Sequence, residues 1–273
     1  MLTVTLNAAL DVTYHVPALD PGATHRVSTM DERAGGKGVN VARILHALGE
    51  PVLATGLVGG GTGATIRTML GDLPHSFVDI AAESRRTVVV NDGTAATGFW
   101  EPGPLVTPGE WQAFVAHYGR LLRDCRIAVL SGSLPPGVPA DAYATLVSLA
   151  RAARVPTVLD SSGEALRLGV AANPSVVKPN AHELAEVTGL AVGSGTGAAD
   201  TVEVAVDRVR AAADAMRGAG STAVVASLGT RGLLATTVDG TWYAQPAQPL
   251  LGNPTGAGDA AVAALARGLA HRL

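Results

Sequence analysis

Short runs rich in Val and Leu alternate with Ala-rich stretches along most of this 273-residue chain. Apolar runs that end in polar residues or glycine lie at Leu2–Leu6, 51–59, 127–134, 156–162, 175–180 and 221–229. Helical patterns at Gly38–Gly49, 63–70, 140–153 and 202–218 separate several of these runs. Such alternation is typical of a parallel sheet with helices on both faces, in which ligands bind beyond the carboxyl ends of the strands. The pattern therefore predicts an α/β fold with its site at that edge.

Two stretches depart from this alternation. Val12–Met30 and Arg86–Pro104 alternate apolar and polar residues with no helix after them, which predicts hairpin strands of a small sheet outside the main core. The tripeptide Asn-Asp-Gly at 91–93 predicts a turn inside the second stretch. We interpret the small sheet as a lid, and Gly189–Asp200 as a flexible surface connection.

The composition limits the class of protein. Hydrophobic residues make up 47% of the chain and aromatic residues 4%, which predicts a core of Ala, Val and Leu. A net charge of −3 argues against a general nucleic-acid or anionic-membrane binder. The single cysteine, Cys125, fits a reducing compartment. No apolar run is long enough to span a membrane and the amino terminus lacks a basic signal region, so we expect a cytoplasmic protein.

A glycine-rich segment, Gly256–Ala257–Gly258, precedes an Ala-rich helical pattern near the end of the chain. Glycine lets several backbone N–H groups converge, and the helix dipole adds positive charge, so this segment suits a phosphate. Asp259 follows in the expected first turn, where it is either a functional carboxylate or a helix-stabilising acid. A dinucleotide-binding fingerprint would need a strand directly before these glycines, and 245–254 has no strand pattern.

A second glycine-rich segment, Ala34–Arg43, also opens a helix. It is no Walker A loop, because Gly38 rather than Ser or Thr follows Lys37. Its glycines permit close approach to a ligand, and the Asn40 amide can donate to and accept from hydroxyls. The alternative is a glycine-rich turn with an exposed lysine.

Three further sets of polar residues follow predicted strands. Asn7 and Asp11 come after the first strand, where a carboxylate binds sugar hydroxyls or caps a turn. The loop at 131–139 contains two serines and a rigid proline turn. Lys178, Asn180 and Glu183 lie at a strand end and a helix start, and a capping Asn explains part of that pattern.

The order of these motifs, AGGKGVN, SGSLPPG, KPNAHEL, SLGTRG and TGAGDA, resembles the PfkB (ribokinase-like) carbohydrate kinase family over essentially the whole chain. The segments TLNAALDVTY, SRRT and EPGP look most like its 1-phosphofructokinase and tagatose-6-phosphate kinase branch. The resemblance implies a ribokinase-like three-layer α/β/α fold with a mostly parallel central sheet and a small β-sheet lid. It implies one kinase domain over 1–273, lid strands within about 12–30 and 86–104, and further C-terminal helices beyond residue 273.

The resemblance also assigns residues to roles. Asp259 matches the catalytic base, and the anion hole around the transferred phosphoryl group matches Gly256, Ala257 and Gly258. Positions that contact the sugar match Asp11, Gly36, Lys37 and Asn40, and those at the phosphate already on the sugar match Arg26, Arg85 and Ser133. The ATP-binding positions match Lys178, Asn180, Glu183, Ser227, Gly229 and Gly232, with Glu183 contacting Mg²⁺ through water. The lid implies a homodimer.

The implied activity is an ATP- and Mg²⁺-dependent kinase that converts fructose 1-phosphate to fructose 1,6-bisphosphate. Tagatose 6-phosphate and fructose 6-phosphate remain alternative acceptors, because Trp100 precedes Glu101 and no lysine follows Arg86, unlike the usual branch pattern. A non-catalytic sugar-phosphate or nucleotide sensor on the same fold is the alternative from another class of protein.

Overall fold

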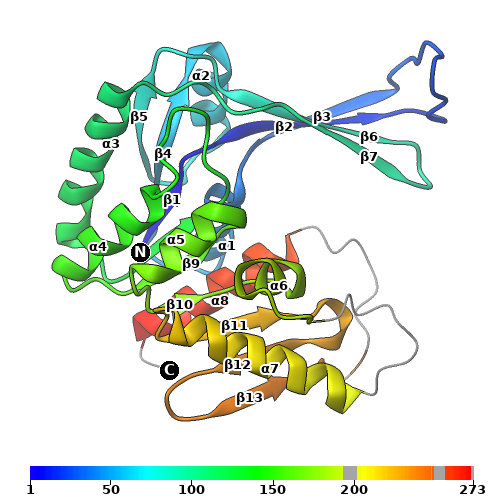
Figure 1. The fold of residues 1–273 in the computed structure, drawn as a ribbon. Helices are drawn as coiled ribbons and strands as arrows, with labels where there is room; N and C mark the ends of the chain where they lie inside the picture. Colours follow the sequence, from blue (N-terminus) through cyan, green and yellow to red (C-terminus); the bar gives the residue numbers. More distant parts are fainter. Residues whose placement is uncertain (193–201, 247, 249–255, 272–273) are drawn as a thin grey trace.

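The computed structural model describes residues 1–192, 202–246, 248 and 256–271, which form one large sheet and one small sheet (Figure 1). The large sheet has the strand order β13-β12-β11-β10-β9-β8-β1-β4-β5. Its strands are β1 (Leu2–Thr5), β4 (Leu53–Gly59), β5 (His75–Ile80), β8 (Ala128–Ser131), β9 (Thr157–Asp160), β10 (Val176–Val177), β11 (Ala223–Ser227), β12 (Leu233–Thr236) and β13 (Thr241–Ala244). All neighbours pair in parallel except β11–β12 and β12–β13, which are antiparallel.

Helices cover both faces of the large sheet because its buried strands are apolar on both sides. On β8, for example, Leu130 packs toward one layer and Val129 toward the other. The first layer contains α3 (Pro108–Leu121), α4 (Ala142–Ala152), α5 (Gly163–Ala171), α6 (Ala181–Thr188) and α7 (Val202–Gly218). The second layer contains α1 (Lys37–Ala47), α2 (Gly60–Met69) and α8 (Ala257–His271). The predicted three-layer α/β/α architecture is confirmed.

The small sheet projects from the body of the molecule (Figure 1). Its order is β3 (Thr29–Gly35), β2 (Ala9–His15), β6 (Arg85–Asn91) and β7 (Ala96–Trp100). Two antiparallel hairpins, β2–β3 and β6–β7, are joined by parallel pairing of β2 with β6. The predicted turn is present after β6, where the Gly93 N–H donates to Asn91 Oδ1 at 2.9 Å.

The predicted limits of the first hairpin were wrong. β2 begins at Ala9 and β3 ends at Gly35, so most of 16–28 is the connection between the two strands. The first five residues of β3, among them Asp31, Glu32 and Arg33, are exposed, so this strand shows no apolar alternation. Hydrogen bonds to β2, rather than burial, hold it in the sheet.

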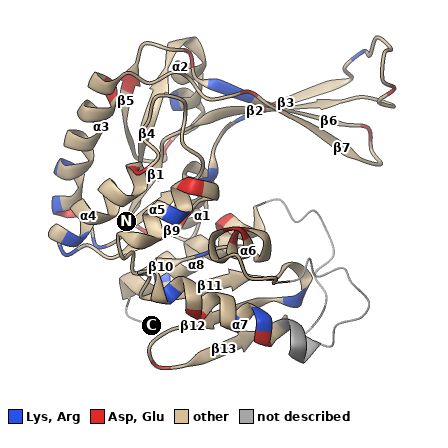
Figure 2. Ribbon diagram, in the orientation of Figure 1, with Lys and Arg blue, Asp and Glu red and all other residues tan. Residues whose placement is uncertain are grey.

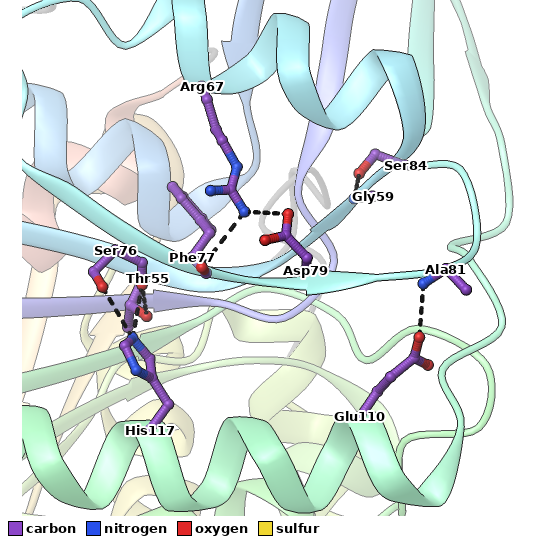
Figure 3. Close-up of polar contacts among 10 residues, drawn as sticks. All are labelled: Thr55, Gly59, Arg67, Ser76, Phe77, Asp79, Ala81, Ser84, Glu110 and His117. Atoms are coloured by element: carbon purple, nitrogen blue, oxygen red, sulfur yellow. Dashed lines mark hydrogen bonds and ion pairs between the residues drawn. The ribbon is translucent and has the colours of Figure 1, made fainter.

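The sequence patterns did not predict α3 or β5; β5 is the edge strand of the large sheet, and α3 packs against it (Figure 1). Thr107 and Glu110 form a reciprocal capping box at the start of α3, with Pro108 as its first residue. Glu110 Oε1 also accepts the Ala81 N–H at 2.7 Å, and His117 Nε2 lies 3.0 Å from the Ser76 carbonyl oxygen (Figure 3). The Thr-x-x-Glu pattern with proline was an available signal for this helix.

Three further features of the fold bear on predictions made from the sequence. The antiparallel pair β12–β13 had no counterpart in the prediction. Residues 193–201 of the expected flexible connection lie outside the described residues. No helix within the described ranges combines the length and hydropathy needed to cross a membrane. Basic and acidic positions are scattered over the molecule in the view of Figure 2.

Candidate active site

A cavity of about 280 Å³ lies between the ends of β1 and β8 and the base of the small sheet. Six of the seven residues predicted to contact the sugar phosphate line it: Asp11, Gly36, Lys37, Asn40, Arg85 and Ser133. Asn7, Thr87, Trp100 and Ser162 line it as well, although none of them was among the predicted site residues. The parallel-sheet rule therefore located the cavity correctly.

The start of α1 explains the first glycine-rich segment. Gly36, which precedes the helix, has φ of 103°, a left-handed conformation that favours glycine. A Cβ on Gly38 would lie 2.5 Å from the Val4 carbonyl oxygen and would also overlap Thr5 Oγ1. The first turn of α1 thus packs directly on β1, and this packing brings Lys37 and Asn40 to the cavity wall.

Asp259 lies in the first turn of α8 and meets α1 across the interface between these helices. Asn40 Nδ2 donates to Asp259 Oδ2 at 2.9 Å, and the carboxylate residue is only 7% exposed. Burial raises the pKa of Asp259 above its ordinary value, and the Asn40 hydrogen bond opposes that shift. A buried, partly compensated carboxylate that is hydrogen-bonded to a residue of the cavity wall is suited to accept a proton.

Asp160, at the end of β9, was missed by the sequence analysis. It is 1% exposed and lies between two cations: Lys37 Nζ at 3.4 Å from Oδ2 and Lys178 Nζ at 3.2 Å from Oδ1. Ser131 Oγ donates to Asp160 Oδ2 at 3.1 Å. The acid thus anchors two lysines on the same side of the sheet as α8. The available signal was an acid at the carboxyl end of a predicted parallel strand.

The start of α8, unlike that of α1, is not packed against other described residues. Gly256 has φ of 86°, and a Cβ there would meet no heavy atom of the described residues within 4 Å. Among the described residues, a Cβ on Gly258 would meet only Lys178 Nζ, at 3.8 Å. Backbone N–H groups, a helix dipole and a buried lysine together fit a phosphate or another anion. The three preceding residues of this motif, 253–255, lie outside the described part of the chain.

The predicted ATP-binding residues other than Lys178 have local structural partners. Asn180 and Glu183 form a capping box at the start of α6. Asn180 therefore caps this helix, which is the structural explanation that its sequence position suggested. The Ser227 N–H donates to the Pro179 carbonyl at 2.9 Å, and a Cβ on Gly232 would overlap the Ala244 carbonyl oxygen. A Cβ on Gly229, in contrast, would meet open space.

Glu183 is the predicted Mg²⁺ contact, and its carboxylate already accepts the Asn180 N–H at 2.8 Å. Across the described ranges, no three His, Cys, Asp or Glu residues gather into a group that could hold a metal ion. The water-mediated contact of Glu183 with Mg²⁺ stays a prediction.

Arg85 and Arg86, adjacent on β6, differ in their surroundings. Arg85 is half-buried beside the cavity, and its guanidinium donates to the carbonyl oxygens of Asn7, at 3.4 Å, and Glu101, at 3.3 Å. Desolvation lowers the pKa of Arg85, and Asp11 opposes that shift. Arg86 is exposed and pairs with Glu101 Oε1 at 3.1 Å. Strand alternation therefore directs one of the two arginines to the cavity.

Arg26 is not brought to the cavity. It is exposed in the connection between β2 and β3, beyond the last paired residues His15 and Thr29. Asp11 lies four residues before His15 on β2, which separates Arg26 from the cavity by roughly 13 Å or more. The role of Arg26 as a phosphate contact stays a prediction.

A larger hollow of about 520 Å³ adjoins Arg85 and is lined by Glu83, Arg86 and Glu101 among others. Its charged groups are already paired. Glu83 Oε2 accepts the Gly61 N–H at the start of α2, at 3.2 Å, and Arg86 pairs with Glu101. The smaller cavity, which is lined by Lys37 and by the Asn40 that contacts Asp259, is therefore the better candidate site.

Comparison with known proteins agrees with this geometry. A model of the pfkB family carbohydrate kinases matches residues 4–273. The tetrameric inhibited form of Escherichia coli phosphofructokinase-2 superposes with a TM-score of 0.89 at 30% identity, covering 99% of this chain and 87% of that one. The same enzyme in complex with fructose-6-phosphate gives 0.87 at 30% identity, with coverages of 100% and 87%. A possible 1-phosphofructokinase from Thermotoga maritima gives 0.79 at 28% identity, with coverages of 98% and 84%.

Proposed function

The chain belongs to the pfkB family of carbohydrate kinases, and on that premise we propose that it transfers the γ-phosphoryl group of ATP to a ketohexose monophosphate. The first-choice acceptor is fructose 1-phosphate, and the product is fructose 1,6-bisphosphate. The observation that carries this proposal is the hydrogen bond from Asn40 to Asp259, because Asn40 lines the same cavity as Arg85 and Ser133.

Asp259 acts as the general base in this proposal. Its carboxylate takes the proton of the free primary hydroxyl of the sugar while that oxygen forms a bond to the γ-phosphorus. The bond from the γ-phosphorus to the β–γ bridging oxygen breaks, and ADP leaves with the electron pair. The Asn40 amide holds the carboxylate in place. A base positioned in this way contributes roughly 10²–10⁴-fold to the rate.

The charge on the transferring group is spread over its oxygens, so it needs fixed positive charge nearby. Lys178, held by Asp160 and directed at Gly258, and the first N–H groups of α8 supply this charge in the proposal. Bound Mg²⁺ would neutralise charge on the ATP phosphates, with Glu183 contacting it through water.

Fructose 6-phosphate is a second candidate acceptor, favoured by the similarity to E. coli phosphofructokinase-2. Both fructose monophosphates place the phosphate and the free primary hydroxyl on opposite sides of the furanose ring. One cavity can therefore hold either sugar with its phosphate near Arg85 and its hydroxyl near Asp259. Contacts between the protein and the ring hydroxyls must then discriminate between the two sugars.

An ADP-release assay with fructose 1-phosphate, fructose 6-phosphate, tagatose 6-phosphate and free fructose tests the proposal. We expect the highest kcat/KM with fructose 1-phosphate. A higher value with fructose 6-phosphate would select the second candidate. Ligand-induced thermal stabilisation without any ADP release would instead support the sensor alternative.

We also propose that the small sheet joins two copies of the chain. Val27, Met30 and Phe99 are between 45% and 57% exposed, and all lie on this sheet or its connection. Exposed apolar residues gathered on one element indicate an interaction surface. Sedimentation velocity should show a dimer that Phe99→Asp converts to monomer. Leu48→Asp, at an exposed position after α1, is the matched control and should leave the dimer intact.

A further inference from the structure

Asn7 lines the sugar cavity but has no role in the proposed chemistry. It follows β1 and precedes β2, so it lies where the chain passes from the large sheet to the small one. Its side chain is buried, with the residue 6% exposed. A buried amide carries two donors and a carbonyl acceptor that need partners. The contacts of Asn7 therefore indicate which groups its side chain holds in place.

The contacts of Asn7 join three segments of the cavity wall. Its Nδ2 donates to Ser133 Oγ at 3.0 Å, and its main-chain oxygen accepts from Arg85 Nε at 3.4 Å. A Cβ on Gly103 would lie 2.8 Å from Asn7 Cγ, so the amide packs against the Gly103 backbone. This packing restricts the amide to a single placement beside Ser133 and Arg85.

The hydrogen bond from Asn7 determines what Ser133 can do. Because Ser133 Oγ accepts from the amide, its own O–H remains available as a donor. Within the described ranges this hydroxyl donates to no protein acceptor, and Ser133 is exposed at the cavity wall. The hydroxyl proton is thus available to an acceptor inside the cavity, next to the Arg85 guanidinium.

We propose that Asn7 is a positioning residue for the phosphate of the sugar substrate, acting through Ser133 and Arg85. This inference rests on the proposed ketohexose-monophosphate kinase function. Asn7 presents the Ser133 hydroxyl as a donor and restrains the Arg85 guanidinium, so that both groups meet a phosphate dianion. In the proposed function the phosphate and the reacting hydroxyl lie at opposite ends of the substrate, and the proposed base Asp259 contacts Asn40. Changes at Asn7 therefore affect binding of the sugar phosphate and leave the chemical step intact.

Asn7→Asp is the sharpest variant, because the new side chain has the same shape but no N–H donor. A carboxylate here accepts the Ser133 O–H, which withdraws that proton from the substrate, and it adds a negative charge near the phosphate. We expect the KM for the sugar phosphate to rise roughly 10- to 100-fold, the effect of losing one charge-assisted hydrogen bond. The kcat and the KM for ATP should change less than about threefold.

Asn173→Asp is the matched control, since Asn173 is exposed in a connection between α5 and β10. It should leave every kinetic constant unchanged. Ser133→Ala, at an exposed position, is expected to fold normally and to show the same rise in KM without loss of kcat. Unchanged KM in Ser133→Ala would overturn the proposal even if Asn7→Asp failed to fold.

A double-mutant cycle separates positioning from a purely structural role. If Asn7 acts through Ser133, Asn7→Ala should raise KM less in a Ser133→Ala background than in the wild type. Fully additive effects, or an equal loss of kcat, would overturn the inference. Wild-type turnover of the sugar phosphates tests the proposed function separately. If the wild type turns over the sugar phosphates but Asn7→Asp keeps a normal KM, the role of Asn7 is wrong and the proposed function stands.

Discussion

The segments Gly36–Lys37–Gly38 and Gly256–Ala257–Gly258 have the same pattern and the same place in their helices. In each, the first glycine precedes the helix with positive φ, 103° and 86°, and the second glycine is the second helical residue. Their surroundings differ. A Cβ on Gly38 would press on the Val4 carbonyl oxygen, whereas a Cβ on Gly258 would meet, within the described part of the chain, only Lys178 Nζ at 3.8 Å.

This difference separates two uses of glycine. At the start of α1, the missing side chain lets the helix pack on β1. At the start of α8, it leaves space that no described residue fills, beside backbone N–H groups, a buried lysine and Asp259. We therefore expect changes in α1 glycines to affect folding and changes at the start of α8 to affect turnover.

Asp259→Asn should have the largest effect on turnover, because it removes the proposed base at the open helix start. We expect kcat to fall roughly 10²–10⁴-fold in the ADP-release assay. Binding of the sugar phosphate, measured by calorimetry without ATP, should change little. Asp239→Asn, in the exposed turn between β12 and β13, is the matched control and should keep full activity.

Asp259→Asn should also change the stability of the folded chain. Burial raises the pKa of Asp259 in the folded chain, so the protonated carboxyl is the form that folding favours. Stability from this group is greatest below the ordinary pKa of an unfolded Asp and falls as pH rises through the raised folded value. Above the raised folded value that loss is complete, and there a neutral amide should keep or raise Tm. A near wild-type kcat would remove Asp259 from the mechanism.

Gly258→Ala tests the open side of the comparison. A methyl group here would occupy space given to the transferring phosphoryl group, and a misplacement of about 1 Å costs roughly 10²-fold in rate. Alanine is also a better helix former than glycine, so Tm should stay constant or rise by the equivalent of about 0.5–1 kcal/mol. A large fall in Tm with a normal kcat would show that this glycine, too, serves packing.

Gly38→Ala is the matched change on the packed side. The gain in helix propensity, up to about 1 kcal/mol, competes with overpacking against backbone, which typically costs about 1–3 kcal/mol. Overpacking should prevail, because the Val4 carbonyl belongs to a central strand and cannot rotate away as a side chain can. Urea denaturation should show lower stability, with kcat per folded molecule little changed. Equal stability would contradict the packing explanation.

The sequence predicted those parts of the molecule that depend on local patterns. The strands with apolar runs, the helices between them and the cavity at the carboxyl ends of the strands all follow from periodicity and parallel-sheet geometry. β3 could not be found in this way, because its exposed charged residues carry no apolar alternation and it depends on pairing with β2. Helix α3 was predictable in principle, since its Thr107–Glu110 capping box is a sequence pattern.

The site shows the same division. Asp11, Lys37 and Asn40 were selected because they follow a strand or a glycine-rich segment, and the fold brings them together. Asp160 was missed because its importance lies in contacts with two lysines that are distant in sequence. Similarly, only the tertiary structure distinguishes a glycine that packs, such as Gly38, from one that faces open space, such as Gly258.

The smallest predicted effect concerns the contact that joins the two helix starts. The acid limb of the pH profile of kcat/KM reports the pKa of the essential base in the free enzyme. Because burial raises the pKa of Asp259, this limb should lie above the ordinary value for Asp. Asn40 donates a hydrogen bond that lowers the pKa, so Asn40→Ala should move the limb to higher pH.

His46→Ala, on α1 but at its far end, where His46 lies 3.3 Å from Asp72, is the control and should leave the acid limb in place. A shift of the limb in Asn40→Ala alone would place the titrating group at the contact between α1 and α8. An acid limb that stays fixed in Asn40→Ala would mean that the group titrating in the profile is another residue. In that case, the open start of α8 would bind an anion without supplying the base.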